Sequence, residues 1–143
     1  MTTYLVLTAI GDDKPGLVES LAQTIASNAG NWLESNMSQL AGKFAGVLRV
    51  SVNDQDADRL IDALEGLSDH LTLVIERVDI DETHNTEQTV ELNLIGNDRA
   101  GIVQEISHAL AKLSVNVEKL TSECAPAPMS GDALFKASAL LKV

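Results

Sequence analysis

The sequence predicts an α+β protein built from two copies of one small unit. Two segments carry the repeat, Gly11–Val18 and Gly96–Val103, which lie 85 residues apart and are identical at four of eight positions. Each segment follows an apolar run and precedes apolar residues at helical spacing. A repeat of this kind indicates a duplicated structural unit. We therefore expect a strand, a glycine-bracketed turn and a helix in each copy.

Composition and charge narrow the functional classes. The chain has 143 residues, 45% of them hydrophobic, and a net charge of −11. This charge disfavours direct binding to nucleic-acid phosphates or anionic membranes. A single cysteine, Cys124, excludes an intrachain disulfide and fits a reducing compartment, and no apolar run approaches the ~20 residues of a membrane span. We expect a cytoplasmic protein in which Cys124 is a small buried side chain.

The first copy opens with an apolar run over residues 4–10, which predicts a buried strand. Apolar residues at helical spacing follow the turn and predict a helix in which Pro15 takes the first position. Gly30 is the expected left-handed residue at the end of this helix.

A hairpin, a second helix and a fourth strand complete the first copy. Alternating residues predict strands over 32–40 and 44–52 joined by a short turn. The small polar and acidic residues at 53–56 then suit the start of a helix, which Gly66 ends before a strand over 70–78. The first copy is therefore βαββαβ across residues 1–80.

The second copy reads as a shorter version of the first. Residues 81–87 are acidic and polar and predict a linker, and residues 88–143 supply only β-α-β-β. The two prolines of residues 125–132 predict a loop there, between strands over 116–124 and 133–143. A β-α-β-β unit leaves one sheet edge unpaired and part of one face uncovered. A truncated form and a partner that supplies the cover both remain open.

A βαββαβ order with a glycine-bracketed turn after the first strand is the ferredoxin-like plan. The run Thr8–Val18, followed by Gly30-Asn31-Trp32, resembles the ACT domain, a small regulatory module that binds amino acids. The second copy, Gly96–Val103 with Asn116-Val117, looks like a degenerate version, with Ala100 where the family usually has proline. Two such units without a catalytic domain resemble the tandem-ACT proteins of the glycine cleavage system transcriptional repressor family.

The turns supply the candidate binding residues. Unpaired amides at a helix N-terminus suit a carboxylate, glycines allow close approach, and aspartate can accept bonds from an ammonium group. Asn31 and Asn116 can both donate and accept. The candidates in the first copy are Gly11, Asp12, Asp13, Lys14, Pro15, Gly16 and Asn31, and those in the second are Gly96, Asn97, Asp98, Arg99, Gly101 and Asn116. A purely structural alternative stays open, in which Asp13 and Asp98 satisfy helix amides and Lys14 and Arg99 are solvated.

The sequence predicts a non-enzymatic regulatory protein. No metal-ligand spacing and no nucleophile–base pair is present, and we expect no cofactor. The resemblance implies a small amino-acid ligand, with glycine or serine plausible, a homodimer, and a partner such as a transcription factor. Two alternatives remain: a ligand-free protein–protein interaction scaffold, and a detached regulatory piece of an amino-acid biosynthetic enzyme.

Overall fold

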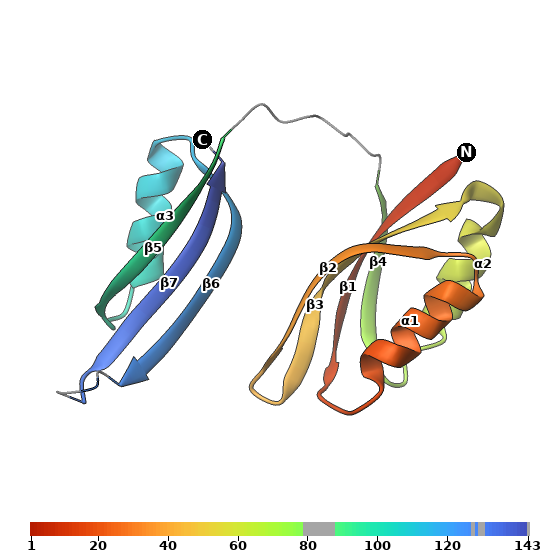
Figure 1. Cartoon of the computed structure of the whole chain (residues 1–143), viewed down its shortest axis with the longest axis horizontal. Helices are drawn as coiled ribbons and strands as arrows, with labels where there is room; N and C mark the ends of the chain where they lie inside the picture. The colour runs from red at the N-terminus through yellow and green to blue at the C-terminus, as the bar shows by residue number, and fades with distance from the viewer. Residues whose placement is uncertain (79–87, 127, 129–130, 143) are drawn as a thin grey trace. The chain divides into compact units, whose positions relative to one another are not determined.

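The computed structural model describes residues 1–78, 88–126, 128 and 131–142 and divides the chain into two units, Met1–Glu82 and Thr83–Val143. The predicted linker over 81–87 lies outside the described residues. Each unit is an α+β sandwich in which helices pack on one face of an antiparallel sheet (Figure 1). The predicted fold class is confirmed.

The first unit is βαββαβ with the ferredoxin-like sheet order β2-β3-β1-β4. Its strands and helices are β1 (Thr2–Asp12), α1 (Leu17–Ser27), β2 (Asn31–Leu40), β3 (Lys43–Asn53), α2 (Asp54–Glu65) and β4 (Thr72–Val78). The central strand β1 pairs with β3 on one side and with β4 on the other. As a result, the connection from α2 to β4 reaches the same end of the sheet as the turn from β1 to α1.

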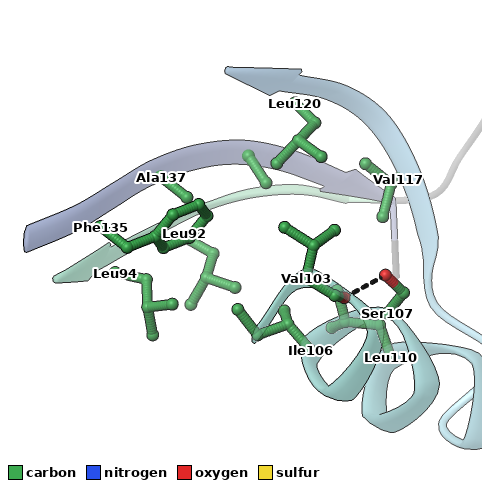
Figure 2. Close-up of a pocket in the computed structure, with 11 residues that line it drawn as sticks. Leu92, Leu94, Val103, Ile106, Ser107, Leu110, Val117, Leu120, Phe135 and Ala137 are labelled. Carbon is green, nitrogen blue, oxygen red and sulfur yellow. Dashed lines mark hydrogen bonds between the residues drawn. The ribbon is translucent and has the colours of Figure 1, made fainter. Parts of the chain in front are cut away.

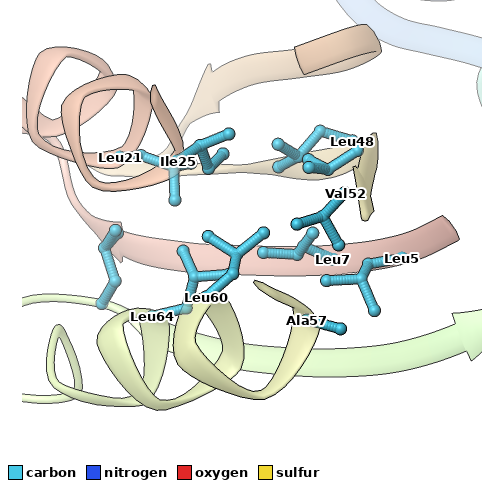
Figure 3. Close-up of a cluster of buried hydrophobic side chains, with 11 residues drawn as sticks. Leu5, Leu7, Leu21, Ile25, Leu48, Val52, Ala57, Leu60 and Leu64 are labelled. Atoms are coloured by element: carbon cyan, nitrogen blue, oxygen red, sulfur yellow. The ribbon is translucent and has the colours of Figure 1, made fainter. Parts of the chain in front are cut away.

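An aliphatic core lies between the sheet and the two helices of this unit (Figure 3). The inward residues of β1 and β3 alternate with outward ones, and the helices contribute apolar stripes. Burying one such side chain contributes roughly 1.5–3 kcal/mol relative to leaving it in water. The buried set is Leu5, Leu7, Leu21, Ile25, Leu48, Val50, Val52, Ala57, Leu60, Leu64 and Leu71, with Trp32 packed against it.

Two predicted roles at the ends of α1 are wrong. Pro15 lies before the helix, because Gly16 takes a left-handed φ of 91° as the N-cap and the helix begins at Leu17. The left-handed residue after the helix is Ala29, with φ 66°, not Gly30. Gly30 is needed for space, since a Cβ there would lie 2.8 Å from Cγ2 of Ile25.

The second unit repeats the first three strands and the first helix. It consists of β5 (Thr89–Asn97), α3 (Ile102–Lys112), β6 (Asn116–Pro126) and β7 (Ala133–Lys142), in the sheet order β5-β7-β6. The likeness extends to irregularities, since β2 and β6 are both bulged, between Trp32 and Glu34 and between Val117 and Lys119. Within the described residues, β5 has a sheet neighbour only on the side of β7.

Two predictions for the second unit need correction. Strand β6 continues through Pro126, which pairs with Ala133, so the loop is shorter than the predicted 125–132. Proline is tolerated there because β6 is an edge strand and Pro126 is its last residue. Cys124 is exposed rather than buried, since it lies near the end of the same edge strand.

Candidate functional site

The first turn leaves the N-terminus of α1 without a side-chain cap. After β1 ends at Asp12, the backbone N–H of Asp13 donates to the carbonyl of Gly42 at 3.1 Å, which ties the turn to the β2–β3 hairpin. Gly16 is the N-cap, and no side chain of the described residues caps α1. The structural alternative in which Asp13 caps this helix is therefore wrong. The first amides of α1 are left for water or a ligand.

A cavity of about 280 Å³ lies at this turn. One wall is the turn and the start of α1, and the other is the connection between α2 and β4. The predicted residues among its lining are Asp12, Lys14, Pro15 and Gly16, joined by Leu17, Ser20, Leu67, Asp69, His70 and Leu71. The cavity therefore brings helix amides, one ammonium group and two carboxylates together.

Gly11 and Asp12 line a neighbouring hollow of about 380 Å³, together with Asp69 and His70. The Asp12 carboxylate accepts a hydrogen bond from Nζ of Lys43 on β3, and both side chains are exposed. This bond and the charge of Lys43, with a smaller effect from Lys14, lower the pKa of Asp12 below its ordinary value. Asp12 is thus held as a carboxylate by its own unit.

Asn31 does not meet the turn within its unit. It pairs with Ser51, which in turn pairs with Tyr4, whereas the turn follows Asp12 at the other end of β1. Asn31 therefore lies at the level of Tyr4 on β1, and the eight residues from Tyr4 to the end of β1 at Asp12 span roughly 26 Å. Asn116 is placed in the same way, because it lies opposite Lys142, which pairs with Thr89. Within one unit, therefore, the structure does not bring Asn31 or Asn116 to the turn, and their role in ligand binding stays a prediction.

The sequence analysis missed the second wall of the cavity, namely Leu67, Asp69, His70 and Leu71. A signal for it was present in the predicted topology. Because the fourth strand of a ferredoxin-like unit is antiparallel to the first, the residues that precede it must lie beside the end of the first strand. The register confirms this geometry, since Ile10 pairs with Thr72.

The second turn has the same backbone but a more open surround. Gly96 and Asn97 end β5, the N–H of Asp98 donates to the carbonyl of Ala133 at 3.0 Å, and Gly101 is the N-cap with φ 84°. No side chain of the described residues caps α3. A Cβ built on Gly96 meets no atom within 4 Å, whereas one on Gly11 would lie 2.9 Å from Cδ2 of Leu71. Among the described residues, the second unit has no α2–β4 connection to form a second wall.

Charges at the second turn are paired differently. Arg99 donates to Glu105 on the first turn of α3, with Nη1 to Oε1 at 3.1 Å. This bond and the opposite charge lower the pKa of Glu105 and raise the pKa of Arg99, although both side chains are exposed. The first copy has Ser20 at the position of Glu105. Lys14 therefore faces its cavity without that carboxylate.

Asp98 lies beside Cys124 of β6. Partial desolvation, together with the charge and hydrogen bond of Asp98, raises the pKa of the Cys124 thiol. Asp98 is thus engaged within its own unit, as Asp12 is in the first.

The described part of the chain contains neither a metal-binding cluster nor a membrane-spanning helix. No group of three or more His, Cys, Asp and Glu side chains is placed there to hold a metal. His84 lies outside the described residues, and His108 is exposed on α3. No helix within the described residues is long and apolar enough to cross a membrane.

Fold and turn together define a ferredoxin-like unit, whose first three strands and first helix recur in the second copy. The family model for the ACT domain matches residues 3–78, more than half of the chain. The protein therefore belongs to the ACT domain family. Among curated proteins, none matches the chain.

Solved structures support the tandem arrangement. A protein of unknown function from Galdieria sulphuraria aligns with the whole chain and 83% of its own length, at 28% identity and a TM-score of 0.87. A candidate glycine cleavage system transcriptional repressor aligns with the whole chain and 81% of its own length, at 19% identity and a TM-score of 0.73. The second likeness shows the shared fold alone.

Proposed function

We propose that the protein is a non-enzymatic regulator that binds a small α-amino acid in the cavity at the first turn. The observation that carries the proposal is that this cavity joins uncapped helix amides to Lys14 on one side and Asp69 on the other. These groups are complementary to the two charged ends of a zwitterion. Amides at a helix N-terminus and an ammonium group favour a carboxylate, and a carboxylate favours an ammonium group.

The assignment of roles follows from which charges are already paired. Asp12 is bonded to Lys43, so Asp69 is the better acceptor for the ligand ammonium group. Gly16, whose missing side chain leaves open space, lets the ligand carboxylate approach the helix amides. The second turn shares the backbone but has Arg99 paired with Glu105 and no facing wall in the described residues. It is the weaker site.

A small ligand fits this cavity, and glycine and serine are the first ligands to test. Among solved structures with this fold is the candidate repressor of the glycine cleavage system. A bound amino acid shifts the population of conformations by its differential affinity for them. The net charge of −11 disfavours direct contact with nucleic acid, so the protein passes this state to a protein partner, such as a transcription factor. It acts in the cytoplasm as a homodimer.

The test is a thermal-shift screen of the full chain against the twenty amino acids at millimolar concentration, followed by calorimetry of any that bind. A ligand at a hundredfold excess over its Kd stabilises the folded state by ~2.7 kcal/mol, so the Tm must rise. We expect a selective rise with one or two small amino acids. Failure of every amino acid to raise the Tm of a well-folded sample would favour the ligand-free scaffold instead.

Variants locate the site. Asp69→Asn and Lys14→Met each remove one charged partner of the ligand, and each should weaken binding about tenfold, in line with a lost charged hydrogen bond. Arg99→Met is the matched control because it removes the equivalent cation of the second turn. Equal losses in Lys14→Met and Arg99→Met would contradict the assignment to the first turn.

A further inference from the structure

The sheet of the first unit has an outer face that neither α1 nor α2 covers. Both helices pack on the inner face, toward which the core residues of β1 and β3 point. Side chains alternate along a strand, so the residues between them point outward. On the outer face, Val47 and Val74 both pair with Thr8 and are 47% and 54% exposed. Ile10, in the next row, is 44% exposed, so these apolar side chains form one patch.

The second unit offers an internal comparison, because its outer face is more polar. Its inward side chains, such as Leu92 and Phe135, point toward α3 around a small apolar cavity (Figure 2), so the residues between them point outward. The strand registers match three apolar residues of the first outer face, Val6, Ala45 and Val47, with Glu91, Lys136 and Ser138 of the second. The apolar outer face is therefore a property of the first unit and not a requirement of the shared fold.

Charged residues lie on both sides of β1 on this outer face. Arg49 on β3 and Glu76 on β4 both pair with Val6, so they lie in one row with Val6 between them. Arg49 is half-buried, and its Nε lies 2.8 Å from Oε1 of Glu34 on the next strand, whereas Glu76 is exposed. The face therefore has a cation beside β1 on one side and an anion beside it on the other.

This arrangement is complementary to itself. Rotation by a half-turn about an axis along β1 exchanges the β3 side of the face with the β4 side. Two copies placed face to face about that axis bring Arg49 of each copy opposite Glu76 of the other, and Val47 opposite Val74. Thr8 meets its own copy on the axis, where two hydroxyl groups can bond to each other. Packed sheets cross at about 30°, which moves contacts one strand from the axis by only roughly 2–3 Å.

A two-fold axis across the strands would lose this match. It would place each strand over its own copy and invert the rows about Thr8, so Glu76 would face Thr72 and Arg49 would face Ala45. Each charge would then lose water without gaining an opposite charge across the contact, which is unfavourable. The charges of the face therefore select the axis along β1.

We propose that the outer face of the first sheet binds the same face of a second copy of the chain, about a two-fold axis along β1. Each copy contributes the same residues, namely Thr8, Ile10, Val47, Arg49, Val74 and Glu76. The contact buries the apolar patch, and the two contacts between Arg49 and Glu76 fix its register. The proposal rests on the homodimer of the proposed function, to which it gives an interface, and it requires no bound ligand.

Charge reversal tests the pairing across the axis, and sedimentation velocity of the full chain measures the Kd of the dimer. Glu76→Arg places two cations opposite each other at both contacts, and Arg49→Glu places two anions there. We expect each variant alone to raise the dimer Kd at least about tenfold. An equimolar mixture of the two should restore dimer formation, because each contact in the mixed dimer again joins opposite charges. Native mass spectrometry with one variant isotopically labelled identifies the mixed dimer.

Glu91→Arg is the matched control, because it makes the same charge change at an exposed position on the outer face of the second sheet. It should leave the dimer Kd unchanged. Circular dichroism and Trp32 fluorescence show whether each variant is folded. The comparison of Glu76→Arg with Glu91→Arg decides the question by itself if Arg49→Glu, which also breaks the pair with Glu34, does not fold.

Three results would each overturn the proposal. They are an unmodified chain that stays monomeric, equal losses in Glu76→Arg and Glu91→Arg, and folded variants that form no mixed dimer. Amino-acid binding is measured separately by thermal shift. A dimer of this kind without a ligand response contradicts only the proposed ligand, and a monomer that binds an amino acid contradicts only this interface.

Discussion

Gly16 and Gly101 show how one backbone angle fixes the geometry of each turn. Both take left-handed φ values, 91° and 84°, immediately before a helix. A residue with a Cβ pays about 1–2 kcal/mol for this conformation, and asparagine tolerates it better than alanine does. The two glycines shared by the repeats are thus explained at the level of the single residue, whether or not a ligand binds.

Gly16→Ala should therefore lower the free energy of unfolding of the first unit by about 1 kcal/mol, and Gly16→Asn should lower it less. Urea titration followed by the fluorescence of Trp32 checks this, because Trp32 is the one tryptophan of the chain and packs against the first core. Equal losses in the two variants would show that φ at this position does not set the cost.

The pair of Asp98 and Cys124 gives a prediction with a definite sign. The Asp98 carboxylate contributes to the raised pKa of the thiol, and the thiolate is the reactive form. Asp98→Asn should lower the thiol pKa toward its ordinary value, so alkylation at a fixed pH of ~8 should become faster. The pH profile of iodoacetamide labelling, read by mass spectrometry, measures this shift.

Glu123→Gln is the control for that experiment. Glu123 is the neighbour of Cys124 in β6, and successive strand residues point to opposite faces. The Glu123→Gln variant should therefore leave the pH profile of labelling nearly unchanged. An equal shift in both variants would mean that net charge, rather than the Asp98 contact, sets the thiol pKa.

At the scale of elements, the connection from α2 to β4 decides how the two turns differ. It packs so closely on the end of β1 that a Cβ on Gly11 would lie 2.9 Å from Leu71 and 3.0 Å from the carbonyl of His70. The same position in the second unit, Gly96, has open space. The shared glycine therefore has a packing role in only one of the copies.

Gly11→Ala should destabilise the first unit by about 1–3 kcal/mol, the usual cost of overpacking, and Gly96→Ala should change stability little. Circular dichroism melts of the two variants, each against the unmodified chain, make the comparison. A matching loss in Gly96→Ala would show that both positions need glycine for backbone conformation.

Periodicity predicted the elements well because the strands and helices of this protein have one apolar and one polar face. The stripe of Ala57, Leu60 and Leu64 and the alternation of Leu48, Val50 and Val52 both mark buried faces correctly. Local rules failed where tertiary contacts intervene. Gly30 is predicted as the helix cap, but it must be glycine because Ile25 leaves no room for a side chain. Cys124 is predicted to be buried, but it is exposed because it lies on an edge strand.

Only one wall of the candidate site could be predicted from the sequence. The turns were found because they repeat, whereas Asp69 and His70 belong to a segment with no second copy to compare. Asn31 is a candidate because its amide can both donate and accept hydrogen bonds, but the antiparallel run of α1 carries it to the far end of the sheet in its own unit. Adjacency along the chain and adjacency in space differ most clearly at that residue.

At the scale of the whole molecule, the two units have unequal cores. The first is closed by two helices and four strands, and the second, in its described residues, has one helix and three strands. Because buried apolar surface is the main favourable term in folding, the second unit should be the less stable. Unequal stability of two units also breaks two-state behaviour.

Urea unfolding of the chain should therefore occur in two steps. Circular dichroism should record an early partial loss of structure, and Trp32 fluorescence should change only in the later step. Leu7→Ala, a core change in the first unit, should move the later step by about 2–5 kcal/mol. Coincident transitions by both probes would contradict this expectation.

The backbone hydrogen bond that ties each turn to its hairpin bears on how the protein can be engineered. The N–H of Asp13 meets the carbonyl of Gly42, and that of Asp98 meets the carbonyl of Ala133. Two residues lie between the paired Leu40 and Lys43, but eight lie between the equivalent pair, Ala125 and Leu134. The anchor has the same register in both copies, although the loop beside it is longer in the second. That loop is consequently a ready-made place to graft a foreign epitope or a reporter tag.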